Sequence, residues 1–140
     1  MDVTPEMADA IGAPVLEAHL SRDLVLVVDS ADTVLRLAPD MERLKALPGA
    51  FAVIATARGE GDVDFVSRFF APGAGIPEDP VTGSSHSTLI PFWSSLLGKD
   101  TMLAKQLSKR GGTLYCRNAG SRVVIGGYAR LYLRGTIEAG

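Results

Sequence analysis

Residues 84–97 limit the fold of this chain more than any other segment, because they predict a helix that is apolar on nearly every side. Its first turn is small and polar, and its second half carries Leu89, Ile90, Phe92, Trp93, Leu96 and Leu97. A helix that is apolar all round is stable only when it is buried. Pro91 lies more than one turn from the start, so it predicts a kink or a local loss of hydrogen bonding inside this helix. The other segments must therefore pack around residues 84–97.

Short strands and short helices account for the rest of the pattern. Thr4, Pro5 and Glu6 are typical of a helix start, and that helix is expected to end near Gly12. The prolines and glycines of 71–83 predict a loop that turns several times. Apolar spacing predicts a helix over 39–47 and strands over 23–28, 51–57, 64–70, 102–107, 112–117, 122–125 and 128–133, and residues 15–20, which alternate loosely, form a further candidate strand. The sequence therefore predicts an α+β fold, with residues 1–140 as a single domain.

Several classes of partner and location are disfavoured by composition. The net charge is −2 and no stretch is strongly basic, so nucleic acid and anionic membranes are not the expected partners. No apolar run approaches the roughly 18 residues that a membrane span needs. The N-terminus lacks the features of a signal peptide, which favours a cytoplasmic location. Cys116 is the single cysteine and is expected to be a buried, inert thiol, and no residue spacing resembles a metal site.

The segment richest in residues suited to catalysis or ligand binding runs from the end of the predicted loop into the predicted central helix. Two acids, Glu78 and Asp79, come four to six residues before Gly83 and Ser84. The free N–H groups and the positive dipole end of a helix start bind anions, and glycine lets a ligand approach the backbone closely. An acid held beside such a site is suited to move a proton on a carbon next to a bound carboxylate. The segment therefore indicates a proton-transfer site on a small carboxylate.

Purely structural roles remain open for the same residues. An Asp-Pro pair before a helix, here Asp79 and Pro80, is common turn chemistry, and Ser84 and Ser85 can cap the helix. His86 is suited either to hydrogen-bond a substrate or to be held by the loop in a partly buried position. Arg110, in residues 106–112, is suited to clamp a carboxylate or to lie in a solvated turn.

The chain resembles the phenazine-biosynthesis PhzF-like family of isomerases and epimerases. The resemblance rests on residues 67–72 (Ser-Arg-Phe-Phe-Ala-Pro), 78–86 (Glu-Asp-Pro-Val-Thr-Gly-Ser-Ser-His) and 91–93 (Pro-Phe-Trp). It continues through residues 106–112 (Gln-Leu-Ser-Lys-Arg-Gly-Gly) and Gly126-Gly127. Members are about twice as long as this chain, and the match corresponds to their C-terminal half.

This resemblance implies a fold, a site and a chemistry. The fold would be one half of a diaminopimelate-epimerase-like protein, a curled, mostly antiparallel sheet around a central apolar helix. Asp79 would be the catalytic acid or base. Gly83, Ser84, Ser85 and His86 would bind the carboxylate substrate. The reaction would be isomerisation or epimerisation by proton transfer at carbon, with no metal and no cofactor.

What the chain lacks, relative to the family, leaves several forms open. The family's main base is a glutamate of the N-terminal half, and Glu78 is too close in the chain to Asp79 to act from the opposite wall of a pocket. The chain would then be half of an isomerase, either a fragment of a two-domain protein or one of two separately encoded halves. Alternatively, a homodimer would place two Asp79 carboxylates face to face. A third possibility is a non-catalytic protein that binds small carboxylates. All three predict an exposed apolar face.

Overall fold

The structure is a computed structural model that describes residues 1–49 and 51–140. Its helices are α1 (Pro5–Ile11), α2 (Ala31–Arg36), α3 (Met41–Ala46), the short 3-10 helix η1 (Pro72–Ala74) and α4 (Gly83–Leu97). Its strands are β1 (Glu17–Leu20), β2 (Leu24–Val27), β3 (Val53–Arg58), β4 (Phe65–Ala71), β5 (Ile76–Asp79), β6 (Thr101–Gln106), β7 (Gly112–Asn118) and β8 (Val123–Gly126). The α+β prediction is confirmed.

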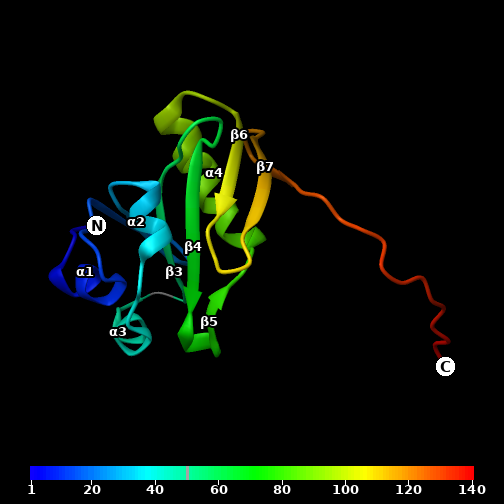
Figure 1. The fold of residues 1–140 in the computed structure, drawn as a ribbon, viewed down its shortest axis with the longest axis horizontal. Coiled ribbons are helices and arrows are strands. Elements are labelled where there is room, and N and C mark those ends of the chain that lie inside the picture. The colour runs from blue at the N-terminus through cyan, green and yellow to red at the C-terminus, as the bar shows by residue number, and fades with distance from the viewer. Residues whose placement is uncertain (50) are drawn as a thin grey trace.

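The described strands join in one sheet, in the order β1-β2-β3-β4-β6-β7-β8, with β5 paired to β4 off this path. Five of the strand pairs are antiparallel and two, β2 with β3 and β4 with β6, are parallel. A parallel pair needs a long crossover. The crossover from β2 to β3 contains α2 and α3, and the crossover from β4 to β6 contains β5 and α4 (Figure 1). The sheet is therefore mostly antiparallel, as the resemblance implies.

Side chains from the two faces of this sheet form two cores. Leu24, Leu26 and Val53 belong to a cluster that includes residues of α1, α2 and α3. Val25 and Ile54, one position along the same strands, belong to a second cluster with residues of α4. This alternation follows from the two-residue period of a strand, which sends successive side chains to opposite faces. The helices α1 to α3 thus cover one face and α4 covers the other.

The predicted central helix is confirmed over its whole length. It runs from Gly83 to Leu97 with Pro91 inside it, and it ends at Gly98, whose φ of 62° closes a left-handed cap. Leu89 and Ile90 are fully buried, and Trp93 stacks on Phe65 at 6.0 Å between ring centroids. Pro91 and Leu96, however, are exposed. The sheet order has two ends, β1 and β8, and α4 is covered by sheet on one side rather than all round.

Two elements depart from the sequence predictions. The short helix α2 was not predicted, although Ser30 caps it by accepting a hydrogen bond from the Thr33 N–H at 3.1 Å. The strand β5 lies inside the predicted loop 71–83 and pairs with β4. Residues 76–79 lack the alternation of a half-buried strand, so only the neighbouring strand explains their extended backbone.

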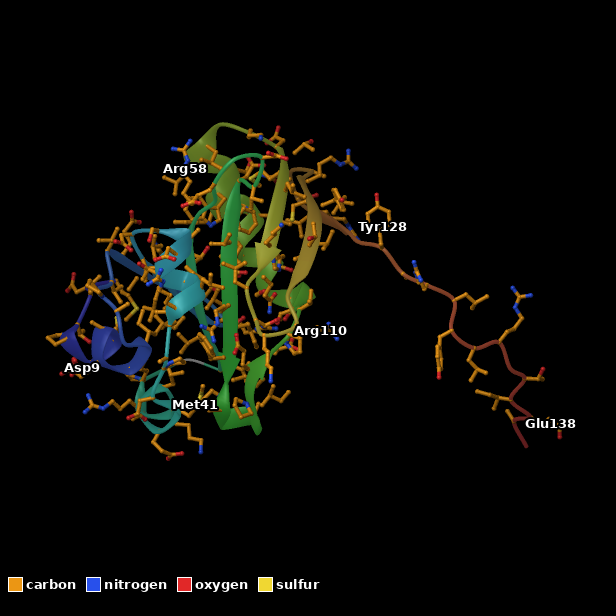
Figure 2. The ribbon with its side chains drawn as sticks, viewed as in Figure 1. Asp9, Met41, Arg58, Arg110, Tyr128 and Glu138 are labelled. Atoms are coloured by element: carbon orange, nitrogen blue, oxygen red, sulfur yellow. The ribbon has the colours of Figure 1, made fainter. Side chains whose placement is uncertain are left out.

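The predicted strand over 128–133 is wrong. The residues after β8 form no helix or strand, and the chain runs away from the sheet as an extended tail (Figure 1). Tyr128 and Glu138 mark its course in Figure 2. The segment has the alternation of a strand, but a strand also needs a neighbour for its backbone hydrogen bonds. No strand in the described part of the chain pairs with it, and its large apolar side chains are 76–99% exposed, at Tyr128, Leu131, Tyr132, Leu133 and Ile137.

We expect this tail to drive self-association without stabilising the fold. Deleting residues 129–140 should change the free energy of unfolding by less than about 0.5 kcal/mol, because these residues are exposed throughout. Deletion should also reduce aggregation, because it removes exposed apolar surface. Urea unfolding and light scattering measure the two effects. A Leu131→Ser, Leu133→Ser variant keeps the tail's length as a control, and a large stability loss on deletion would contradict this view.

No helix among the described residues combines the length and the apolar character that crossing a membrane requires.

Candidate functional site

Asp79 ends β5, immediately before the turn that leads into α4. It pairs in register with Phe69 of β4, so the central sheet fixes its backbone. The Thr82 hydroxyl donates a hydrogen bond to Asp79 Oδ2 at 2.6 Å. Thr82 is the residue before α4, and its side chain makes no bond to the backbone of the helix that it precedes. Asp79 is therefore tied through Thr82 to the start of α4.

The start of α4 is open. Gly83 and Ser84 are exposed, and a Cβ atom added at Gly83 would meet no other atom within 4 Å. The first N–H groups of a helix have no partner in the preceding turns, and the helix dipole favours an anion there. The α4 helix is 15 residues long, so its dipole is well developed. The arrangement suits a carboxylate bound at Gly83 and Ser84.

A cation that the sequence did not single out lies beside this helix start. Arg22, in the turn between β1 and β2, donates from Nη2 to Ser84 Oγ at 3.1 Å. The same guanidinium pairs with the buried carboxylate of Asp23, which raises the pKa of Arg22. Arg22 is half exposed, with 53% of its side chain accessible. Because Asp23 balances the charge of Arg22, the guanidinium serves the helix start chiefly as a hydrogen-bond donor.

Ser85 and His86 point into the protein and hold the turn before α4. Both are buried, and both bond to the Thr82 carbonyl, Ser85 from Oγ at 3.0 Å and His86 through Nδ1 at 2.7 Å. A carbonyl only accepts, so Nδ1 carries the proton. Within the described chain, His86 Nε2 is buried without a hydrogen-bond partner. This geometry fits the structural role that the sequence left open, and substrate contact by these two residues stays a prediction.

Burial gives His86 a testable effect on stability. Desolvation lowers the pKa of His86, and the bond to the Thr82 carbonyl opposes this shift. The unfolded chain therefore takes up a proton at a higher pH than the folded chain does. Stability should fall as the pH drops below about 6.5, by at most about 1.4 kcal/mol per pH unit for this one group.

Urea unfolding between pH 7.5 and 5 tests this effect. His86→Asn keeps a side-chain N–H for the Thr82 carbonyl but cannot titrate, so it should show a shallower slope of stability against pH. His19→Gln is the matched control, because His19 is exposed, where its imidazole bonds to Glu17 and lies beside the Phe92 ring. Equal slopes in His86→Asn and the wild-type chain would show that His86 contributes nothing to the pH dependence.

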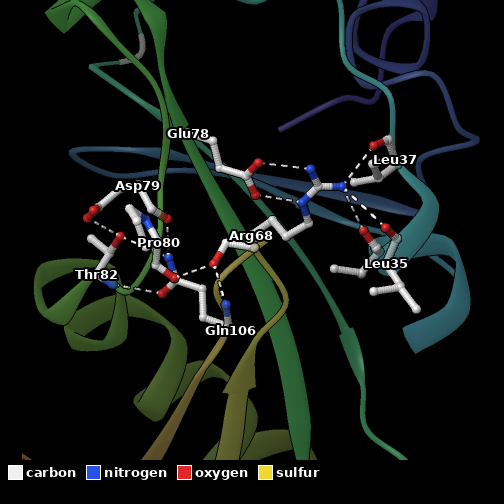
Figure 3. A network of polar contacts seen from close by, with 11 residues as sticks. Leu35, Leu37, Arg68, Glu78, Asp79, Pro80, Thr82 and Gln106 are labelled. Atoms are coloured by element: carbon white, nitrogen blue, oxygen red, sulfur yellow. Dashed lines mark hydrogen bonds and ion pairs between the residues drawn. The ribbon is translucent and has the colours of Figure 1, made fainter.

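Gln106, at the end of β6, binds the turn that carries Asp79. Its Nε2 donates to the Asp79 carbonyl at 2.8 Å and to Thr82 Oγ1 at 3.0 Å, and its Oε1 accepts from the Thr82 N–H at 2.8 Å. Figure 3 shows the amide lying between the two residues. The side chain is fully buried, with an exposed fraction of 0%. Gln106 thus fixes the spacing of Asp79 and the start of α4.

Arg68 anchors β5 from its other side. It makes a two-pronged ion pair with Glu78, from Nε at 2.7 Å and from Nη2 at 3.0 Å (Figure 3). Its Nη1 donates to the Leu37 carbonyl at 2.8 Å, just after α2. Glu78 is therefore used in a structural ion pair, which agrees with the expectation that it does not replace the missing base.

The remaining residues singled out by the sequence lie outside this cluster. Arg110 is exposed in the turn between β6 and β7 and lines a shallow cavity of about 430 Å³ with Glu78, Pro80, Ser108 and Lys109. Cys116 is buried, as predicted, and burial raises the pKa of its thiol to about 11. Among the residues that the structure describes, no group of three or more His, Cys, Asp and Glu side chains is placed to hold a metal ion.

The structure thus brings Asp79, Gly83 and Ser84 to one end of α4. Sequence reasoning missed Arg22, because no local motif marks it. Gln106 and Arg68 stand within the segments that carry the family resemblance, but their contacts with Asp79 and Glu78 cross 27 and 10 residues of chain. Only the paired strands show what these two side chains reach.

Comparison with known protein families matches residues 8–135 to the phenazine biosynthesis-like protein family. The chain belongs to this PhzF-like family. Two uncharacterized isomerases of Pseudomonas aeruginosa are 46% and 47% identical to it over 136 residues, which is 96% of this chain. The chain spans about half the length of these relatives, 52% and 51%.

Solved structures agree with the assignment to the PhzF-like family. A PhzF-family phenazine biosynthesis protein of Enterococcus faecalis superposes with a TM-score of 0.91 at 46% identity, over 95% of this chain and 51% of its own. A PhzC/PhzF protein of Clostridium difficile gives 0.86 at 42% identity, over 99% and 53%. A PhzF-family protein of Bacillus anthracis, at 20% identity and a TM-score of 0.63, shares the fold, over 86% and 49%.

Proposed function

We propose that this chain is the C-terminal half of a PhzF-like isomerase or epimerase that moves a proton at a carbon atom of a small carboxylate substrate. The observation that carries the proposal is the link from Asp79 through the Thr82 hydroxyl to an open helix start. It supports the proposal because Asp79 lies close to the exposed start of α4, where a helix favours an anion. Two relatives that match nearly the whole chain are named isomerases, which supports the reaction class.

In this proposal each part of the site has one task. The N–H groups around Gly83 and Ser84, aided by Arg22, hold the substrate carboxylate. Fixed donors at a carboxylate also stabilise the charge that develops when the neighbouring carbon loses a proton. Asp79 exchanges a proton with that carbon. The reaction needs no metal or organic cofactor.

The second base would come from the half that this chain does not span. Proton removal from one face and return to the other needs groups on opposite walls of a pocket. Glu78 is held by Arg68 and lies beside Asp79 in the chain, so it does not provide the second wall. We therefore propose a complementary half as the partner, which would cover the exposed start of α4.

Reconstitution tests the proposal. The chain is co-expressed with the part of a Pseudomonas aeruginosa relative that it does not span, and the pair is incubated in D₂O with small carboxylates bearing a C–H bond next to the carboxyl group. Deuterium at that carbon, measured by mass spectrometry, is the expected result. The intact relative is the positive control and each half alone is the negative control. Exchange by the intact relative but not by an assembled pair would contradict the assignment of the catalytic acid to this half.

A further inference from the structure

The hydrogen bonds of Gln106 fix which way its amide group points. A backbone N–H can only donate and a backbone carbonyl can only accept. Gln106 Oε1 lies 2.8 Å from the Thr82 N–H, and Gln106 Nε2 lies 2.8 Å from the Asp79 carbonyl. A flipped amide would face a donor with its NH₂ group and an acceptor with its oxygen, and it would lose both bonds. The orientation therefore follows from backbone chemistry.

This orientation sets the direction of the next two hydrogen bonds. The second N–H of Gln106 points at Thr82 Oγ1, 3.0 Å away. The Thr82 hydroxyl therefore accepts from Gln106 and has a single proton to donate. Its other partner is Asp79 Oδ2 at 2.6 Å. The chain of donors thus runs in one direction, from Gln106 through Thr82 to Asp79.

In a protonated carboxyl group the hydroxyl oxygen is a weaker acceptor than the carbonyl oxygen, so the bond that Thr82 donates to Oδ2 favours the acid proton on Oδ1. Asp79 Oδ1, by contrast, receives no hydrogen bond from any residue in the described part of the chain, and Asp79 is only half buried. We propose that Thr82 is a positioning residue, whose hydroxyl, oriented by Gln106, keeps Oδ2 as an acceptor and makes Oδ1 the oxygen of Asp79 that takes up and releases the proton.

The role of Oδ1 rests on the proposed function, in which one proton moves between Oδ1 and the substrate carbon. When Asp79 acts as the acid, the bond between Oδ1 and hydrogen breaks and its electron pair stays on Oδ1. The electron pair of the carbanionic substrate carbon forms the new C–H bond. When Asp79 acts as the base, the same bonds form and break in reverse. In both directions Oδ2 keeps its bond from Thr82, which holds the carboxyl group in place while its charge changes.

The Asp79→Asn variant of the chain reports the direction of these bonds without substrate. A donating Thr82 hydroxyl should turn the oxygen of the new amide toward Thr82 and its NH₂ group away. In NMR spectra we expect no nuclear Overhauser cross-peak between the side-chain NH₂ of the introduced asparagine and the Thr82 methyl group. A strong cross-peak would place the NH₂ group against Thr82 and would overturn the proposal.

Two further variants distinguish the effect of the Thr82 hydroxyl on the amide orientation from the effect of side-chain packing around it. In Asp79→Asn with Thr82→Ser the hydroxyl remains, so the single amide orientation should persist, as read from the absence of a cross-peak to the methylene group of the introduced serine. In Asp79→Asn with Thr82→Val the hydroxyl is lost, and a cross-peak to the methyl groups of the introduced valine should appear. One fixed orientation in the valine variant, with the NH₂ group still turned away, would refute the role of Thr82. Because these spectra need no turnover, they are independent of the deuterium-exchange test of the proposed function.

Discussion

Replacing Arg68 with methionine is expected to destabilise the chain by about 3 kcal/mol, the lower end of the usual cost of removing one partner of a buried ion pair, because Arg68 and Glu78 are only partly buried. Only 12% of the Arg68 side chain and 22% of the Glu78 side chain are exposed. The variant leaves Glu78 without its cation and the Leu37 carbonyl without its donor. Urea unfolding, followed by the fluorescence of the buried Trp93, measures the loss.

An exposed pair supplies the control for this prediction. Arg36 bonds to Asp32 within α2, and both side chains are more than half exposed, so Arg36→Met should cost no more than about 0.5 kcal/mol. Adding Glu78→Gln to Arg68→Met should recover part of the loss, because the uncompensated charge is gone. If Arg68→Met costs no more than Arg36→Met, Arg68 does not anchor β5.

The parts of the fold that local patterns determine were predictable. The segment that became α4 has a small, polar start, an apolar body and a closing glycine at Gly98, and these signals act within a few residues. The strands β3, β4, β6 and β7 contain apolar or alternating runs that bury one or both faces, and each was predicted to within about two residues at its ends. These elements are buried in the two cores, which requires the apolar patterns from which they were predicted.

Two of the errors, β5 and residues 128–133, share a physical cause, which is dependence on a distant neighbour, whereas α2 was missed although its Ser30 cap is local. The backbone of β5 is extended because β4 lies beside it, although residues 76–79 look like a loop. Residues 128–133 have the alternation of a strand but no partner strand in the described structure. Pairing is a property of two segments, so the pattern of one segment cannot establish it.

The candidate site likewise contains residues that a local motif reveals and residues that only the folded sheet brings together. Asp79, Gly83 and Ser84 lie within six residues of one another and form a local motif that the sequence displays. Arg22 reaches Ser84 across 62 residues, and Gln106 reaches Thr82 across 24. These two side chains arrive from the β1–β2 turn and from the end of β6, so their contacts depend on the assembled sheet.

Asp79→Asn is expected to slow deuterium exchange in the reconstituted protein by about 10²–10⁴-fold, the usual contribution of a positioned acid or base. The loss should fall on kcat, because the amide keeps the size of the carboxyl group but cannot exchange a proton at this position. Ser84→Ala should instead raise KM, with a smaller change in kcat, because it removes about one hydrogen bond to the carboxylate in the ground state and the transition state alike.

Kinetics at several substrate concentrations separate the two effects, and Ser87→Ala, an exposed serine one turn further along α4, is the matched control. Circular dichroism and gel filtration establish that each variant still folds and assembles with its partner half. If Asp79→Asn leaves the exchange rate unchanged while Ser84→Ala weakens binding, this half binds the carboxylate without taking part in proton transfer. Both catalytic groups would then belong to the other half. The helix start of this half would supply only the electrostatic attraction that brings the substrate to them.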